Sequence, residues 1–204
     1  MAVWCALLAR HTASPDVEAT GRALLARWCE PHRRYHDIAH LRGILGYVDQ
    51  LADYAGDADA VRLAAWYHDA VYDGLPDDEE RSAQTAEAEL ALLGLPGAVV
   101  AEVARLVRMT VTHDPACGDR DGEVLSDADL ATLALPAEDY QRNSVAIRAE
   151  YAHVPEDTFR AARARMIEAL LAEPQLFRTP MARQRWEAAA RTNLREELVT
   201  LTLD

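Results

Sequence analysis

The spacing of apolar residues limits the fold of this chain more than any other feature. Apolar residues recur mostly at the three- and four-residue intervals of a helix, and no stretch sustains a period-two alternation of apolar and polar residues. A half-buried strand needs that alternation, whereas a helix needs one apolar stripe. The sequence therefore predicts an all-α fold.

Proline, glycine and short polar clusters mark where these helices should begin and end. The first five main helices are expected at about residues 15–30, 36–54, 59–72, 78–94 and 96–112. A loop is expected at 114–123, because it contains one proline and two glycines. A short helix at about 126–134 should follow it, and Pro136, Pro155 and Pro180 should open the last three helices.

Length and composition favour a single folded domain. A chain of 204 residues can bury one substantial core, and 50% hydrophobic with 27% charged residues is ordinary for a globular protein. The chain has no repeats, linkers or low-complexity tracts. The apolar stretch 2–9 lacks the features of a signal peptide and is too short to span a bilayer, so we expect it to begin a core helix.

Charge and cysteine usage narrow the partners and the compartment. The net charge of −13 argues against nucleic-acid binding, which needs a basic surface, and nothing indicates a membrane partner. A small anionic substrate stays compatible with this charge, because a bound metal and a few arginines can reverse the local field. The three cysteines form no CxxC pair, so we expect a cytoplasmic protein without disulfides.

Two segments combine histidine with a second group that can bind metal. His36 and His40 are four residues apart, so on a helix they would lie on one face and could address a common site. His68 and Asp69 lie in an apolar stretch, and an imidazole with a carboxylate suits a transition metal. Each pair also has an ordinary explanation, as hydrogen-bonded histidines or as a simple His–Asp contact.

A third segment, around Asp127 and Asp129, is equally ambiguous when taken alone. Ser126 and Asp129 have the spacing of a helix-capping box, so these carboxylates could serve only to begin a helix. The order of the three segments along the chain is more informative than any one of them. A histidine pair is followed by a His–Asp pair and then by two closely spaced carboxylates.

This order resembles the HD superfamily of metal-dependent phosphohydrolases, and most closely a bacterial group of predicted HD phosphohydrolases. The matching segments are Arg33–His40, His68–Asp73, Glu79–Ala83 and Asp127–Leu130. The resemblance implies a single HD-type helical bundle over residues 1–204, with a metal-site core at about 31–135 and C-terminal helices at about 136–204. It also implies hydrolysis of a phosphoester by metal-activated water.

The resemblance also implies individual roles. His40, His68, Asp69 and Asp129 would bind a divalent transition metal, which could be Mn, Fe, Co, Ni or Zn, and a second ion could bind beside it. Asp129 is preferred to Asp127 because residues 128–130 resemble the late ligand segment of cyclic nucleotide phosphodiesterases. The entry segment of those enzymes resembles residues 35–40, which implies that His36 transfers a proton. Asp69 would also bridge a second ion or orient the water.

Further candidates follow from chemistry and position. Arg33, Arg34 and Arg81 are predicted to bind the phosphate of a small phosphorylated substrate, since guanidinium groups suit phosphate, although each could instead be a solvated surface residue. Glu79 and Glu80 are candidates to order a metal-bound water, with Glu80 selected as the catalytic residue, or else they favour the first turn of their helix. His113 could add a ligand or simply end a helix.

Two other functions remain open at this point. The first is an HD-type oxygenase with two irons, whose scaffold this chain also resembles. Those enzymes characteristically place two histidines between the HD pair and the last aspartate. Here that interval contains only His113. The second is a sensor that keeps the metal and binds a nucleotide without catalysis, yet no ligand position of the pattern has been lost. The sequence therefore favours hydrolysis.

Overall fold

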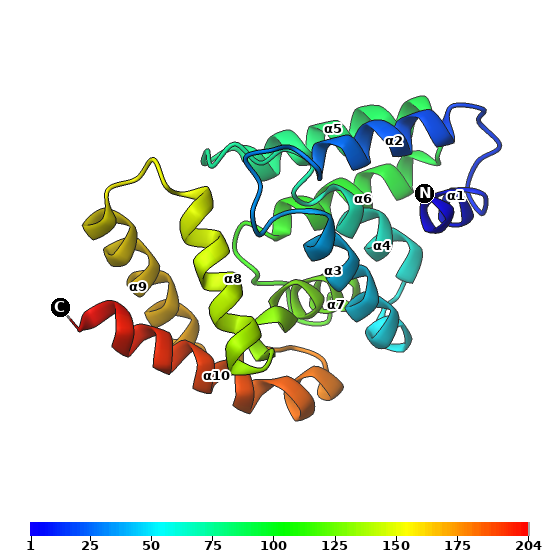
Figure 1. Ribbon diagram of the computed structural model, residues 1–204. Helices are drawn as coiled ribbons and strands as arrows, with labels where there is room; N and C mark the ends of the chain where they lie inside the picture. Colours follow the sequence, from blue (N-terminus) through cyan, green and yellow to red (C-terminus); the bar gives the residue numbers. More distant parts are fainter. Residues whose placement is uncertain (204) are drawn as a thin grey trace.

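The structure describes residues 1–203 of the chain. This part contains ten α-helices and two short 3-10 helices, joined by turns and loops, and no strand. Figure 1 shows their arrangement in the computed structural model. The α-helices are α1 (Ala2–Leu8), α2 (Val17–Arg27), α3 (Ile38–Leu51), α4 (Ala58–Tyr67), α5 (Asp78–Leu92), α6 (Gly97–Met109), α7 (Arg120–Leu130), α8 (Ala137–Glu150), α9 (Glu156–Ala172) and α10 (Pro180–Thr202). The 3-10 helices are η1 (Ala52–Tyr54) and η2 (Ala131–Ala134).

Helix α4 lies at the centre of the fold because its sequence is apolar on nearly every side. Seven of its ten residues, from Ala60 to Tyr67, are buried. A helix that is apolar all round must be covered on all faces, and α3, α5, α6 and α7 pack against α4. The first helix adds Trp4, Leu7 and Leu8 to the same core, as predicted for the N-terminal apolar stretch.

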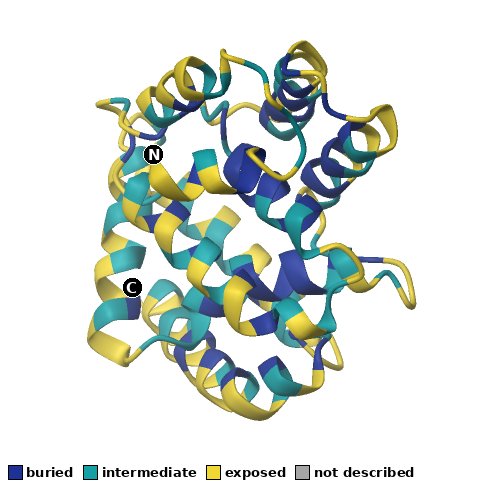
Figure 2. Ribbon diagram, turned by 90° about the vertical axis from the view of Figure 1, so that its right-hand side faces the viewer, coloured by how far each residue is buried: buried dark blue, intermediate teal, exposed yellow. Residues whose placement is uncertain are grey.

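Helices α8, α9 and α10 form the other side of the molecule (Figure 1). Helix α10 packs against α9 and η2, and the amide of Asn193 donates hydrogen bonds to the carbonyl groups of Leu133 and Leu135 at 2.8 and 2.9 Å. These bonds connect α10 to the end of the segment that follows α7. Figure 2 shows buried residues where helices face one another and exposed residues on the outer faces.

The structure confirms the all-α class and a single domain, and most boundaries lie within a few residues of the prediction. The loop expected at 114–123 is shorter, because α7 already begins at Arg120. Asp119 caps this helix by accepting the N–H of Gly122 at 3.1 Å. A Cβ at Gly122 would collide with the capping carboxylate of Asp119, so glycine at this position leaves room for the cap. Gly122 therefore belongs to the start of a helix and not to a loop. Ser126 is therefore inside a helix, and the capping-box interpretation is wrong.

Two other boundaries differ in ways that matter for the site. Helix α3 begins after His36, since Asp37 is its N-cap and accepts the N–H groups of Ala39 and His40. The prediction that His36 and His40 stack on one helical face is therefore wrong. Helix α4 ends at Tyr67, so His68 is its C-cap and Asp69 lies in the turn beyond. No helix in residues 1–203 is long and apolar enough to cross a membrane.

Candidate metal centre

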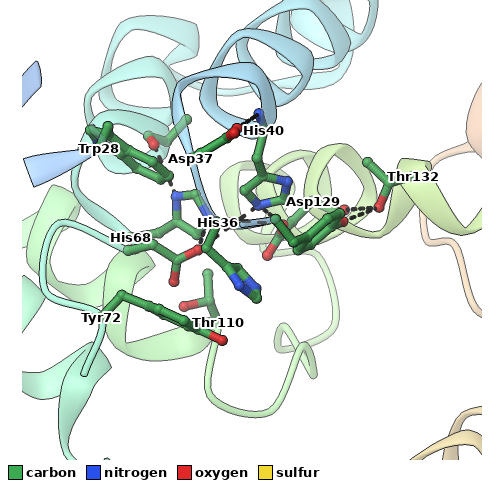
Figure 3. Close-up of polar contacts among 12 residues, drawn as sticks. Trp28, His36, Asp37, His40, His68, Tyr72, Thr110, Asp129 and Thr132 are labelled. Atoms are coloured by element: carbon green, nitrogen blue, oxygen red, sulfur yellow. Dashed lines mark hydrogen bonds and ion pairs between the residues drawn. The ribbon is translucent and has the colours of Figure 1, made fainter. Parts of the chain in front are cut away.

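Four side chains from three distant segments converge in the core. His40 lies in the first turn of α3, His68 and Asp69 follow α4, and Asp129 lies in the last turn of α7. His40 Nε2 lies 3.4 Å from Asp129 Oδ1, and His68 Nε2 lies 3.1 Å from Asp69 Oδ2. The other two histidine–carboxylate distances are 3.8 and 3.9 Å. Figure 3 shows the histidines and Asp129 facing a common point.

His40, His68 and Asp69 form a buried group that could hold a metal ion. Ligand atoms bound to one ion at about 2.0–2.2 Å lie roughly 2.8–3.6 Å apart, close to the separations observed. His40 Nε2 and His68 Nε2 are buried without a hydrogen-bond partner. The Nδ1 of His68 lies 2.9 Å from the carbonyl of Ala65, which leaves its Nε2 lone pair directed at the centre. The residues present therefore fit a divalent transition metal.

Burial and charge act in opposite directions on these groups. Burial lowers the pKa of His40. Burial also disfavours a charged His68, but the carboxylates of Asp69 and Asp129 outweigh it and raise its pKa to about 9, so a metal ion would have to displace the Nε2 proton before this nitrogen could bind it. Burial would raise the pKa of both carboxyl groups, yet the neighbouring histidines hold the pKa of each well below its usual range. Both carboxyl groups are thus ionised at neutral pH, which is the form in which a carboxyl group binds a metal.

The structure distinguishes the two aspartates of α7. Asp129 faces the histidines, whereas Asp127 accepts the backbone N–H groups of Arg178 and Thr179 at 2.6 and 2.7 Å. Burial raises the pKa of Asp127 to about 6, although these hydrogen bonds favour its ionised form. Asp127 therefore connects α7 to the segment before α10, whereas Asp129 lies beside His40 and His113, and its role as a metal ligand stays a prediction.

His36 is held by Glu150, a residue that the sequence analysis missed. One Glu150 oxygen accepts the backbone N–H groups of Arg34, Tyr35 and His36 at 2.7 to 2.9 Å, and the other lies 2.7 Å from His36 Nδ1. Burial opposes the charge of Glu150, but the bond with His36 and those from the backbone lower its pKa to about 2. The His36 ring also stacks on Tyr72, with centroids 4.1 Å apart. No sequence motif marks Glu150, which is one carboxylate among many on the helix surfaces.

The three arginines predicted to bind phosphate do not line the cavity beside the metal centre. Arg33 is buried and donates to the backbone carbonyls of His36 and Asp69 at 3.0 and 2.8 Å. It therefore fixes the backbone around the site, and its predicted role as a phosphate ligand is a wrong assignment. Arg34 is exposed, and Arg81 is bonded to Asp73.

Glu79 takes the position predicted for Glu80. Two bonds from Arg108, at 2.6 and 2.8 Å, hold the exposed Glu80 outside the cavity, and they lower its pKa to about 2. Glu79 lines the cavity, and burial followed by the charge of Asp69 raises its pKa. The adjacent position was chosen wrongly because the helix start at 78 was known only approximately, and one residue turns a side chain by about 100°.

His113 lies at the edge of the centre, where it could add a ligand. Its Nε2 is 3.4 Å from Asp129 Oδ2, and its Nδ1 is buried without a hydrogen-bond partner. His113 also has a positive φ of 51°, a left-handed backbone conformation that residues other than glycine adopt only rarely. Such strain is often found at functional positions, and burial lowers the pKa of this imidazole.

The metal centre opens into a cavity of about 820 Å³. This volume is in the range of small-molecule sites, about 300–1,000 Å³. Tyr35, Thr110 and Thr132 line it near the metal centre, and helices α8 and α9 form its far walls. Tyr35 and Thr132 are hydrogen-bonded to each other at 2.8 Å, which fixes this part of the wall.

Comparisons of the chain with protein-family models, with curated proteins and with solved structures find no match. The resemblance of the sequence motifs to the HD superfamily therefore stays a hypothesis.

Proposed function

We propose that the protein is a metal-dependent hydrolase of phosphoesters, acting on a small phosphorylated substrate. The observation that carries this proposal is the convergence of His40, His68, Asp69 and Asp129 at one end of a cavity, with His36 beside them. Two imidazoles and two carboxylates suit a divalent transition metal. The imidazole of His36 supplies a proton donor that is separate from the metal ligands.

His40, His68, Asp69 and Asp129 would hold the ion. When bound, a divalent metal lowers the pKa of a water ligand and places positive charge beside a phosphoryl oxygen. The protein contributes the low-dielectric surroundings, since Trp28 covers one side of the centre, with its ring centroid 5.4 Å from that of His68. Excluding water there strengthens every charge interaction with the substrate.

His36 and Glu150 supply the proton transfer. Hydrolysis breaks the bond between phosphorus and the ester oxygen, and a bond from water to phosphorus replaces it. The departing oxygen then needs a proton, which His36 can donate from Nε2. Glu150 accepts from Nδ1 and thereby fixes the orientation of the ring. General acid catalysis of this kind contributes about 10² to 10⁴ in rate.

The proposal is tested by measuring metal content and phosphate release on the same preparation. We expect about one transition-metal ion or more per chain after purification without chelators, and metal-dependent release of phosphate from at least one phosphorylated metabolite. Oxygen consumption measured in parallel is expected to be absent. Oxygen uptake with stoichiometric product would instead establish the oxygenase, and ligand-induced stabilisation without any product would establish the sensor.

A further inference from the structure

The cavity has a second part that the proposed chemistry does not use. Five apolar residues line it on the side of α8 and α9, and we call this lining the apolar trough: Ile147, Val154, Phe159, Met166 and Leu170. Ile147 lies on α8, and the last three lie along one side of α9 with helical spacing. The trough therefore runs between these two helices.

The trough is partly open: its residues are half-buried apart from the exposed Met166, and the Arg148 guanidinium lies over the Phe159 ring, 4.8 Å from its centroid. Met166 is 40% exposed, and Ala162 and Ala169 beside it on α9 are also exposed. Helix α9 packs against α10 along its length, and its contacts with α8 are made at its first turn, where Arg148 donates to Glu156 at 2.8 Å and lies over Phe159. A concave apolar surface of this kind, continuous with a polar site, is typical of a pocket for a ligand with an apolar part.

The charges around the cavity limit how many phosphates a substrate can carry. Five carboxylates line it: Asp69, Asp129, Glu79, Asp114 and Glu173. Two arginines line it in residues 1–203, and one of these, Arg163, is already bonded to Glu197 at 2.9 and 3.1 Å. The other, Arg178, has a buried Nε without a partner. Even two divalent ions would do little more than balance the carboxylates, so a polyphosphate chain would meet no excess of positive charge.

We infer that the substrate is an ester of a single phosphate with an elongated apolar alcohol, whose phosphate binds at the metal centre while its apolar part lies in the trough. This inference rests on the proposed function, because the metal centre fixes the position of the phosphate. It excludes nucleoside triphosphates and small sugar phosphates as the preferred substrates. Burying the alcohol in the trough adds binding energy with each methylene group.

Binding of alkylphosphonates tests the inference independently of turnover, because these compounds have no ester bond to hydrolyse. We would measure the Kd of ethyl-, butyl-, hexyl- and octylphosphonate for the metal-loaded protein by calorimetry. Affinity should rise by up to about fourfold per methylene group until the trough is filled. An affinity that does not depend on chain length would overturn the inference.

Turnover of the matching alkyl phosphates separates this inference from the proposed function. The primary alcohols are similar leaving groups, so a rise in kcat/KM with chain length reports the trough and not the chemistry. Chain-length-dependent phosphonate binding without any hydrolysis would refute the proposed function and leave the trough intact. Equally fast hydrolysis of ethyl and octyl phosphate would support the proposed function and refute the inference that the trough binds the apolar part of the substrate.

A matched pair of variants on α9 locates the effect. Ala162→Trp fills the trough and should lower the ratio of octyl- to ethylphosphonate affinity at least tenfold. Ala161→Trp adds the same side chain at an exposed neighbour that does not line the cavity, and it should leave the ratio unchanged. Equal metal content and melting temperature would show that both variants fold. If Ala162→Trp instead abolishes self-association and leaves the ratio unchanged, the trough is covered by a second copy of the chain and the inference is wrong.

Discussion

The metal centre and the apolar trough share one cavity but are built in opposite ways. At the metal centre, side chains come from α3, α7 and the turn after α4, and neighbouring groups hold them in buried positions. In the trough, α8 and α9 contact each other mainly where Arg148 meets Glu156 and Phe159, and Met166 and Ala162 remain exposed. Reactive groups need fixed positions, whereas an apolar tail needs only surface area.

Glu150 connects these two regions. It ends α8, a helix that contributes four residues, Tyr140, Asn143, Ser144 and Ile147, to the cavity wall, and it holds the backbone and the ring of His36. The position of His36, the proposed proton donor, therefore depends on how the C-terminal helices pack against the core. The two regions should respond differently to substitution, and the following predictions measure that difference.

The largest effect is expected at Asp129. Asp129→Ala should remove tight metal binding and reduce activity by about 10³-fold or more, because the metal carries several kcal/mol of charge stabilisation. Metal content per chain, measured by plasma mass spectrometry, and phosphate release are the readouts. Asp127→Asn is the matched control, and it should keep the metal while lowering the melting temperature, since it weakens the bonds to Arg178 and Thr179. Full metal occupancy in Asp129→Ala would contradict the assignment of Asp129 as a metal ligand.

A smaller effect is expected at His36. His36→Ala should keep the metal and slow turnover by about 10² to 10⁴, the usual contribution of a general acid. Single-turnover rates and metal content should be measured together. Loss of the metal in this variant would mean that the roles of His36 and His40 are exchanged.

Glu150→Gln should slow turnover roughly tenfold, less than removal of His36, because the ring would remain but lose its orienting carboxylate. The same variant has a pH-dependent effect on folding. The pKa of Glu150 is about 2 in the folded protein, below its ordinary value of 4.5, so its ionised form stabilises the fold. That contribution, on the order of 2–3 kcal/mol, is present above pH of about 4.5 and disappears as the pH falls toward 2.

Urea unfolding of wild type and Glu150→Gln at several pH values checks this sign. The difference in the free energy of unfolding should be largest near neutral pH and should shrink below pH of about 4. A difference that stays constant across this range would show that Glu150 acts through packing and not through its charge.

The smallest effect is expected at Arg178, on the rim of the cavity. Arg178→Met should raise KM by about two- to fivefold and leave kcat unchanged, because Arg178 lines the cavity as a partly exposed charge that is already paired with Asp114 at 3.3 Å. Arg81→Met is the control, since Arg81 is bonded to Asp73 and does not line the cavity. If KM rises in the Arg81 variant and not in the Arg178 variant, the prediction from the sequence that Arg81 binds the phosphate would be supported instead.

Helical periodicity and the apolar segments predicted the all-α class, because both depend on residues that are neighbours in the chain. The ordered motifs also selected His40, His68, Asp69 and Asp129, which the structure brings together. Boundaries were less predictable, since an N-cap such as Asp37 or Asp119 decides the start of a helix through a single side-chain bond. Those small shifts moved His36 off its helix.

The sequence by itself determined that the chain is helical and which residue types can form its metal centre, since helix formation and ligand chemistry are properties of short segments. Only the tertiary structure decided that Glu150 holds His36, that Asp129 and not Asp127 faces the histidines, and that Arg33 is buried. These outcomes depend on which face each helix presents after packing. A rotation of one residue about a helix changes that face by about 100°, and local sequence does not fix it to that precision.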